Sequence, residues 1–330
     1  MKGHILNDLN TKVFLAPMAG VTDLSFRLIC REFGARFCFF EMLDVHSVVY
    51  GHPRSLRIIK TLKEDRPIAA QLLGSDPGSV LEAALKITGI LKISLIDINA
   101  ACPAKKVIRK KAGAYLLKDR GRLSGIIKRL SSGLKTPVTV KIRTNYGERD
   151  IKECLKTAEE CEASGAQAVF IHGRTARQGY AGDVDYEAIK AVKERLAIPV
   201  IGSGNIFDPL SARMMLCETG CDGIMVARGA LGRPWIFEEI DSFLENRRPL
   251  GPKTLAFKKK VLKRHLSYIE RYKDLREKDK MGFMVKVAMW YLKGLPHAAG
   301  IRSNLCRVRS FRDLKRTVDN VGIEVRLQEI

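Results

Sequence analysis

The sequence has no apolar run long enough to cross a membrane and no cysteine arrangement suited to a metal. A membrane-spanning helix needs about 20 consecutive, largely apolar residues, and charged residues interrupt every stretch of that length. The first ten residues lack the apolar segment and the small-residue cleavage site of a secretory signal. The eight cysteines form no CxxC pair and no cluster with histidine. We therefore expect a cytoplasmic protein with reduced thiols and no metal site.

Internal repeats and low-complexity tracts are also absent. Apolar residues make up 46% of the chain and charged residues 28%, which is an ordinary balance for a folded domain. The 330 residues exceed a typical domain of about 100–200 residues, but they suit a barrel of about 250 residues with a smaller appendage.

Positive charge is what the chain has in excess. Lys and Arg number 58 against 36 Asp and Glu, a net of +22. Residues 251–330 hold 20 of these cations and only eight acidic residues, so more than half of the excess lies in a quarter of the chain. Such an excess predicts a polyanionic partner, and composition leaves open RNA, DNA or an anionic membrane surface. A highly charged soluble surface without such a partner is the alternative.

Eight short segments rich in β-branched and apolar residues alternate with helix-compatible sequence, which is typical of parallel strands in an α/β fold. We expect strands at Val13–Met18, Phe37–Glu41, Ile68–Leu72, Leu95–Asn99, Val138–Ile142, Ala168–His172, Pro199–Gly202 and Gly223–Ala227. We expect helices at Asp23–Phe33, Asp76–Ile90, Arg149–Ser164, Tyr186–Leu196, Asp208–Thr219 and Pro234–Glu245. Eight such units favour a closed (β/α)8 TIM barrel over an open doubly wound sheet.

A charged, proline-bearing linker follows at residues 246–252. Beyond it the strand pattern disappears, and Leu255–Lys273 and Met281–Leu292 have helical patterns. We therefore predict two domains, a barrel over residues 1–245 and a smaller, all-helical, basic domain over residues 246–330. The charge of the second domain suits a role in holding nucleic-acid phosphates.

Polar or small residues cluster at the C-terminal ends of the predicted strands, where the active site of a (β/α)8 barrel lies. They are Met18-Ala19-Gly20, Glu41, Gln71, Asn99 with Cys102, Lys141 with Arg143, His172 with Arg174, Ser203-Gly204-Asn205 and Ala227-Arg228-Gly229. The glycines after the last two strands, together with Arg228, are typical of a phosphate site. Simple tight turns are the alternative interpretation.

Two of these residues indicate particular chemistry. Lys141 is a lone cation at the end of an otherwise apolar strand, so it needs an anionic partner. A reduced flavin, which is negatively charged around N1, would serve, and a Schiff-base lysine is the rival hypothesis. Cys102 lies beside Pro103 and near Lys105, which favours a reactive thiol, acid or nucleophile, although many free cysteines are only small buried hydrophobes.

Six motifs occur in order along residues 12–240. They are Ala16-Pro17-Met18-Ala19-Gly20-Val21-Thr22-Asp23, Gln71-Leu72-Leu73-Gly74-Ser75-Asp76-Pro77, Asp97-Ile98-Asn99 with Cys102-Pro103-Ala104-Lys105-Lys106-Val107, Lys141-Ile142-Arg143, His172-Gly173-Arg174-Thr175 and Gly232-Arg233-Pro234-Trp235. Together they resemble the tRNA-dihydrouridine synthase family, most closely its bacterial B-type branch. An ordered set of this kind is far more specific than any single motif.

The resemblance implies an enzyme that reduces the C5–C6 double bond of a uridine in tRNA, with FMN as cofactor and NADPH or NADH as reductant. It implies hydride transfer from N5 of reduced FMN to C6 and a proton from Cys102 to C5, on a base that has left its stack. By the same resemblance, FMN would contact Pro17, Met18, Ala19, Gln71, Lys141, His172, Ser203, Gly204, Asn205, Ala227 and Arg228. We expect the substrate to contact Asn99, Lys106, Arg143 and Arg174. The expected partner is tRNA, with no DNA and no membrane, and the expected state is a monomer.

Three positions depart from the family pattern. Ala101 stands where glycine usually precedes the cysteine, Ser203 replaces a frequent asparagine, and Ala227 replaces a frequent glycine. An alanine excludes backbone conformations that only glycine adopts. Two alternatives stay open: a flavoenzyme acting on a free pyrimidine, against which the cationic tail argues, and an RNA-binding protein without catalysis, against which Cys102 and Lys141 argue.

Overall fold

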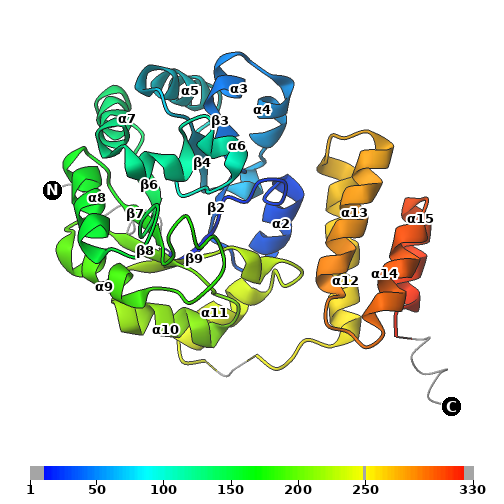
Figure 1. Cartoon of the computed structure of the whole chain (residues 1–330). Helices are drawn as coiled ribbons and strands as arrows, with labels where there is room; N and C mark the ends of the chain where they lie inside the picture. The colour runs from blue at the N-terminus through cyan, green and yellow to red at the C-terminus, as the bar shows by residue number, and fades with distance from the viewer. Residues whose placement is uncertain (1–10, 248–249, 323–330) are drawn as a thin grey trace.

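Eight parallel strands close into a barrel (Figure 1). The structure, a computed structural model, describes residues 11–247 and 250–322. The strands there are β1 (Val13–Leu15), β2 (Phe37–Phe39), β3 (Leu43–Asp44), β4 (Ile68–Leu73), β5 (Leu95–Ala100), β6 (Val138–Arg143), β7 (Val169–His172), β8 (Val200–Ser203) and β9 (Gly223–Val226). The order β2-β1-β9-β8-β7-β6-β5-β4 closes because β2 also pairs with β4. The two-residue strand β3 pairs only with β4 and is not one of the eight strands that close the barrel. The predicted (β/α)8 TIM barrel is therefore confirmed.

The helices of the barrel share one capping device. They are α2 (Leu24–Glu32), α3 (Val45–Val49), α4 (Pro53–Ile58), α5 (Pro77–Ile90), α6 (Lys105–Ile108), α7 (Arg120–Gly133), α8 (Ile151–Ala163), α9 (Tyr186–Arg195), α10 (Pro209–Thr219) and α11 (Ile236–Leu244). In α2, α3, α5, α7, α8, α9 and α10 an N-cap aspartate accepts a backbone N–H from the first turn. Such a cap stabilises a helix by about 1 kcal/mol and sets where it begins. The loops that lead into these seven helices therefore have a defined end, whereas α4, α6 and α11 lack an aspartate cap.

Phenylalanine fills the inside of the barrel. Phe14, Phe37, Phe39 and Phe170 are almost fully buried and pack edge to face, with ring centroids 5.4–5.7 Å apart. Burial of one such side chain contributes about 1.5–3 kcal/mol. Side chains alternate along a strand, so the next inward-facing residues toward the carboxyl ends lie in a layer above this phenylalanine layer. The phenylalanine layer is the floor of the site described below.

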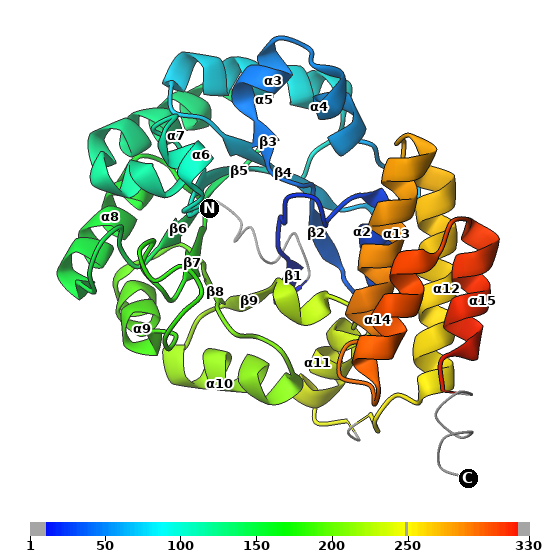
Figure 2. The same cartoon turned by 45° about the vertical axis from the view of Figure 1, so that its right-hand side comes forward.

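The tail is helical, as predicted for its described part, and packs on the barrel beside α2 (Figure 2). Its helices are α12 (Leu255–Tyr272), α13 (Glu277–Tyr291), α14 (Ala298–Arg307) and α15 (Phe311–Asn320). Lys273 pairs with Asp23, and Arg264 Nε donates to Glu32 Oε1 over 2.6 Å. A Cβ on Gly232 would lie 2.3 Å from the backbone oxygen of Trp290, so only glycine permits this close approach.

One hydrophobic core runs through both parts of the chain. Val261, Leu262 and Leu266 of α12 are buried in the same cluster as Ile29 of α2. The division at residue 245 stays a prediction, and residues 1–10, 248–249 and 323–330 of the predicted domains lie outside the described residues. Among the described helices, none is both long and apolar enough to traverse a bilayer.

Candidate active site at the mouth of the barrel

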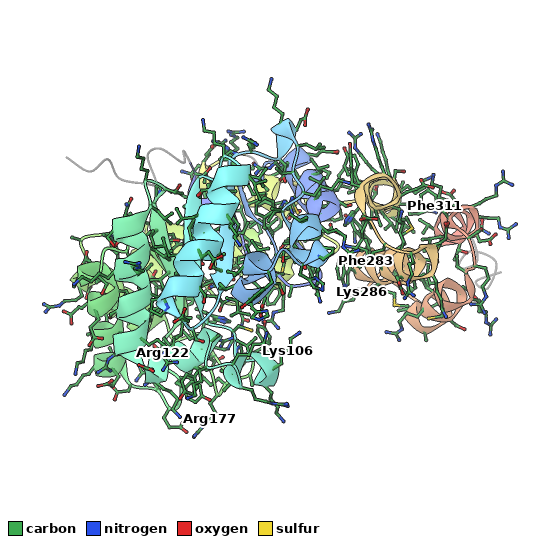
Figure 3. The ribbon with its side chains drawn as sticks, turned by 90° about the horizontal axis from the view of Figure 1, so that it is seen from above. Lys106, Arg122, Arg177, Phe283, Lys286 and Phe311 are labelled. Carbon is green, nitrogen blue, oxygen red and sulfur yellow. The ribbon has the colours of Figure 1, made fainter. Side chains whose placement is uncertain are left out.

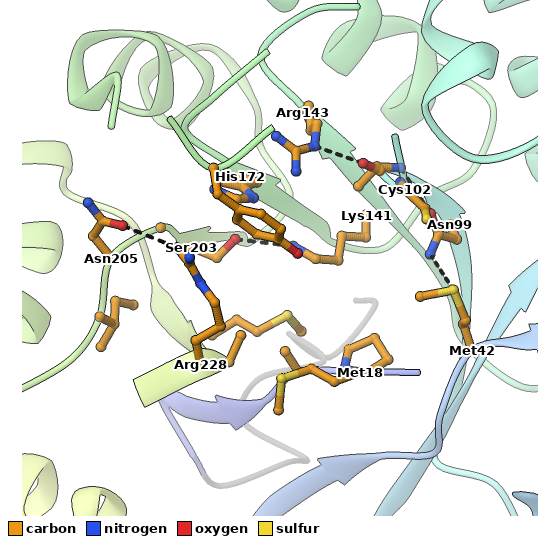
Figure 4. Close-up of a pocket in the computed structure, with 18 of the residues that line it drawn as sticks. Met18, Met42, Asn99, Cys102, Lys141, Arg143, His172, Ser203, Asn205 and Arg228 are labelled. Carbon is orange, nitrogen blue, oxygen red and sulfur yellow. Dashed lines mark hydrogen bonds between the residues drawn. The ribbon is translucent and has the colours of Figure 1, made fainter. Parts of the chain in front are cut away.

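A cavity opens above the phenylalanine layer, at the carboxyl ends of the strands (Figure 4). Thirteen of the predicted site residues line it: Pro17, Met18, Gln71, Asn99, Cys102, Lys141, Arg143, His172, Ser203, Gly204, Asn205, Ala227 and Arg228. Ala19, Lys106 and Arg174 do not line it. The strand-end rule for (β/α)8 barrels therefore located most of this cavity from the sequence.

Lys141 supplies the cation at the centre of the cavity. Its Nζ donates to Ser203 Oγ over 3.1 Å, and Ser203 Oγ donates to Ile171 O over 3.2 Å. No carboxylate among the described residues forms an ion pair with Lys141. Burial lowers the pKa of Lys141 to about 8, although the charge of Asp97 opposes the shift. A half-buried ammonium without an ion-pair partner favours an anionic ligand.

His172 lies beside Lys141 as a neutral base. Burial, followed by the charges of Lys141 and the neighbouring arginines, lowers the pKa of His172 to about 2. The imidazole is therefore uncharged at any working pH, and it can donate one hydrogen bond and accept another. His172 Nε2 lies 3.5 Å from Arg174 Nη1.

One end of the cavity has the features of an anion site. Residues 203–206, the anion turn, leave β8 with Asn205 in the left-handed region at φ 49°. The backbone N–H groups of Gly204, Asn205 and Ile206 have no acceptor within the described parts of the chain. Arg228 reaches the same turn, with its Nη2 3.5 Å from Asn205 Oδ1. Free N–H groups beside a guanidinium form a concave anion-binding surface.

Cys102 lies at the other end of the cavity, in the loop of residues 101–104 that follows β5. Asn99 Oδ1 accepts the backbone N–H groups of Ala101 at 3.0 Å and of Cys102 at 2.9 Å. Arg143 Nε donates to Ala101 O over 2.8 Å. Ala101 has no positive φ, so this loop forms without the glycine that is usual in the family. The half-buried thiol of Cys102 lines the cavity.

A buried polar layer supports the Cys102 loop from below. Asp97 Oδ2 accepts from Gln71 Nε2 and Asp97 Oδ1 accepts from Thr139 Oγ1, both at 2.7 Å. Asn99 Nδ2 donates to Gln71 Oε1, also at 2.7 Å. Burial raises the pKa of Asp97 to about 6, against the effect of these hydrogen bonds. The polar contacts thus continue from β6 through β5 and β4 to the loop.

Two residues predicted to contact the substrate, Arg143 and Arg174, bind the backbone of loops in this structure. Arg143 also donates to the backbone oxygens of Thr175 and Gly179. Arg174 is buried and donates to Gly182 O at 2.6 Å and to Asn205 Oδ1 at 3.3 Å. Lys106 is exposed on α6, outside the cavity. Their contact with substrate stays a prediction.

Sequence reasoning missed several lining residues. Tyr180 is 61% exposed and lies under the guanidinium of Arg228, 4.2 Å from the ring centroid. Met42 and Phe207 also line the cavity. Met42 directly follows Glu41, the last residue of a predicted strand, so the strand-end rule could have found it. Tyr180 comes from the middle of a long loop, and no local pattern could have placed it.

Fold and site together define a (β/α)8-barrel enzyme with a cavity for an anionic ligand and a thiol at its edge. The family described as dihydrouridine synthase (Dus) matches residues 14–325. The tRNA-dihydrouridine synthase B of Pseudomonas aeruginosa is 38% identical over 304 residues, which cover 91% of this chain and 90% of the relative. That of Escherichia coli K12 is 38% identical over 289 residues, 86% and 88% of the two chains. The chain belongs to the dihydrouridine synthase family, is most similar to its bacterial B-type branch, and is a flavin-dependent oxidoreductase.

Solved structures share the barrel fold. Histamine dehydrogenase from Rhizobium sp. 4-9 aligns with a TM-score of 0.54 and 14% identity, over 78% of this chain and 49% of that one. A 2-naphthoyl-CoA reductase aligns with a TM-score of 0.54 and 11% identity, over 72% and 50%. The chain thus spans half or less of the length of these two proteins, and the likeness concerns the fold alone.

Proposed function

We propose that this protein reduces the C5–C6 double bond of a uridine in tRNA to 5,6-dihydrouridine, with FMN as cofactor and NADPH or NADH as reductant. We propose further that it works in the cytoplasm as a monomer. The observation that carries the proposal is the order of groups along one cavity: the anion turn with Arg228, then Lys141, then Cys102 (Figure 4). This order matches a ligand with a phosphate at one end and a ring that becomes anionic at the other.

The residues present fit FMN. The free N–H groups of the anion turn and Arg228 suit its phosphate, and the unneutralised Lys141 suits a reduced flavin ring. The cofactor contacts that we propose are Pro17, Met18, Ala19, Gln71, Lys141, His172, Ser203, Gly204, Asn205, Ala227 and Arg228. When bound, FMN would take up two electrons from the reduced nicotinamide cofactor and supply hydride for C6 of the uracil.

Cys102 is the proposed general acid. Its thiol gives a proton to C5 of the uracil, and the thiolate that is left regains a proton from solvent. Asn99 and Arg143 keep the loop of residues 101–104 in place, because they bind its backbone from both sides. Because the pKa of His172 is lowered to about 2, its acidic imidazolium form is absent at neutral pH, and we assign the proton donor to Cys102 instead.

A basic groove between barrel and tail supports an RNA substrate. It lies beside the cavity and is lined from α4 and its C-terminal loop by Arg54, Arg57 and Lys60, and from the tail by Phe283 and Lys286. In Figure 3, Phe283 and Lys286 lie between the barrel and the remaining tail helices. Cations interleaved with aromatic side chains suit a nucleic-acid backbone with splayed bases. A free pyrimidine would need no such surface.

Reconstitution tests the cofactor assignment. Protein stripped of ligand and incubated with FMN should turn yellow and quench flavin fluorescence with a stoichiometry of one. The same preparation should oxidise NADPH or NADH when tRNA is added, and it should not do so with free uracil or uridine. Protein that stays colourless with FMN would contradict the proposal, and turnover of free uracil would favour the alternative pyrimidine reductase.

A further inference from the structure

Asp97 is a fully buried carboxylate below the cavity. Both of its oxygens accept hydrogen bonds, one from Thr139 and one from Gln71. Lys141 is the charged group that acts on it from the neighbouring strand β6. Asp97 lines no part of the cavity itself, so it can contact a ligand there only through other residues.

An ionised carboxylate accepts hydrogen bonds and cannot donate them. Gln71 must therefore turn its Nε2 toward Asp97, which leaves Oε1 to accept from Asn99 Nδ2. Asn99 must then turn its Oδ1 toward the backbone N–H groups of Ala101 and Cys102. If either amide were inverted, an N–H donor would face another donor at one end of that amide, and an oxygen would face another acceptor at the other end. One anion thus determines the direction of two amides in series.

We propose that Asp97 is a positioning residue for the proton donor: through Gln71 and Asn99 its carboxylate holds the loop of residues 101–104 so that Cys102 faces the cavity. The inference rests on the proposed function only for the role of Cys102 as the acid. The chain of hydrogen bonds, and its effect on the loop, can be measured without cofactor or substrate.

The test compares two isosteric substitutions, one of Asp97 itself and one of a residue that donates a hydrogen bond to it. Asp97→Asn keeps the shape and removes the group that dictates direction. Thr139→Val removes the other hydrogen bond to Asp97 and leaves the chain through Gln71 intact. Amide hydrogen exchange of the peptide that spans residues 99–106, and alkylation of Cys102 by iodoacetamide followed by mass spectrometry, report the loop in flavin-free protein.

We expect Asp97→Asn to speed both exchange and alkylation at the loop by about tenfold, which is the effect of losing one hydrogen bond to a charged group. Thr139→Val should change them by less than about twofold, because the hydrogen bond that it removes is not part of the chain from Asp97 to the loop. In the FMN-loaded enzyme, Asp97→Asn should lower kcat and leave KM for tRNA unchanged. Equal loop exchange and alkylation in the two variants would overturn the proposal.

A rescue makes the test specific. The double variant Asp97→Asn with Asn99→Asp moves the carboxylate to position 99. There it can accept hydrogen bonds from the backbone N–H groups of the loop and from the side-chain amide of Gln71. Loop protection should return to near the wild-type value, although Gln71 would then be inverted. A double variant as exposed as Asp97→Asn would contradict the directional mechanism.

Misfolding of Asp97→Asn and a failure to bind FMN can each be distinguished from an effect on the loop. If Asp97→Asn does not fold, Gln71→Met interrupts the same chain one residue later and should expose the loop in the same way. If the protein fails to bind FMN, the proposed function is lost, whereas the loop measurements still decide the role of Asp97. Normal FMN binding and uridine reduction with an unaffected loop would leave the function standing and remove Asp97 from it.

Discussion

At the scale of single residues, Lys141 sets the charge of the cavity. Within the described residues its ammonium donates a hydrogen bond to Ser203 Oγ and forms no ion pair, although the charges of Asp97 and Arg143 act on it. Desolvation without a carboxylate partner is costly for a cation. An anionic ligand in the cavity would complete the surroundings of this lysine.

The affinity of the apoprotein for FMN should therefore depend on pH through Lys141. The pKa of Lys141 is lowered to about 8 by burial, so the ammonium is present below that pH and is lost as the pH rises through it. FMN affinity should fall by about tenfold between pH 7 and pH 9.5, a change of about 1.4 kcal/mol. Fluorescence titration measures it. In Lys141→Met the affinity should be weaker at pH 7 and nearly flat with pH; a wild-type affinity without pH dependence would contradict this role.

Substitution of Cys102 separates acid catalysis from cofactor binding. Cys102→Ala should retain FMN with near wild-type affinity, because the cofactor contacts that we propose lie elsewhere in the cavity. Turnover on tRNA should drop by about 10²–10⁴-fold, the usual contribution of a general acid. Reduction of the bound flavin by NADPH, followed by stopped-flow absorbance, should keep its rate. An unchanged rate of uridine reduction would remove the thiol from the mechanism.

At the scale of elements, one buried ion pair fixes the loop that enters the cavity from β1. Arg27 of α2 is fully buried and binds Asp65 through Nη2 over 2.7 Å. Its Nη1 donates to Thr22 O, also over 2.7 Å, and Thr22 Oγ1 in turn accepts from Met18 N. The helix, the segment before β4 and the loop with Met18 are thus joined at one guanidinium.

Arg27→Met should lower the free energy of unfolding by about 3–5 kcal/mol, because it leaves the carboxylate of Asp65 buried with fewer partners. Arg177→Met is the matched control. Arg177 forms an ion pair with Glu148 in which both side chains are at least 70% exposed, and its loss should cost less than about 1 kcal/mol. Urea denaturation followed by circular dichroism gives both values. Equal stabilities of the two variants would show that the buried pair does not stabilise the fold.

Local sequence patterns predicted most of the strands and helices that repeat around the barrel, but not all of them. β6 and α5 were expected at nearly their observed bounds, because a run of β-branched residues and an Asp-Pro cap are local signals. α3 and α4 are too short to show helical periodicity, whereas α7 was overlooked although its buried Leu123, Ile126, Ile127 and Leu130 recur at helical spacing. The strand ends supplied the candidate site, whereas Tyr180 and the direction of the Gln71 amide arise only from tertiary packing.

At the scale of the whole molecule, the tail and the barrel form one surface for a polyanion. The basic groove is lined by five cationic and three acidic residues, and one of the acidic residues, Asp23, pairs with Lys273. The exposed Lys106 belongs to the barrel and lies outside the groove (Figure 3). A tRNA held along the groove would have its neighbouring bases within reach of the mouth.

Neutralising the groove should weaken tRNA binding in a salt-dependent way. Arg57→Ala and Lys286→Ala should each lower affinity and reduce the slope of log K against log salt by about 1. Lys135→Ala is the control, because Lys135 is exposed just before β6, at the opposite end of the barrel. Filter binding from low to high salt measures the slopes. Identical slopes for all three variants would place the RNA elsewhere.

The reduced nucleoside in tRNA can be detected directly. FMN-loaded protein, NADPH and tRNA from cells that lack this protein are incubated, and the nucleosides are analysed by mass spectrometry. We predict that a defined uridine gains two hydrogens, and that Cys102→Ala with the same flavin content forms almost none of this product. A wild-type enzyme that carries FMN yet leaves every uridine unreduced, with NADPH and with NADH, would contradict the central claim.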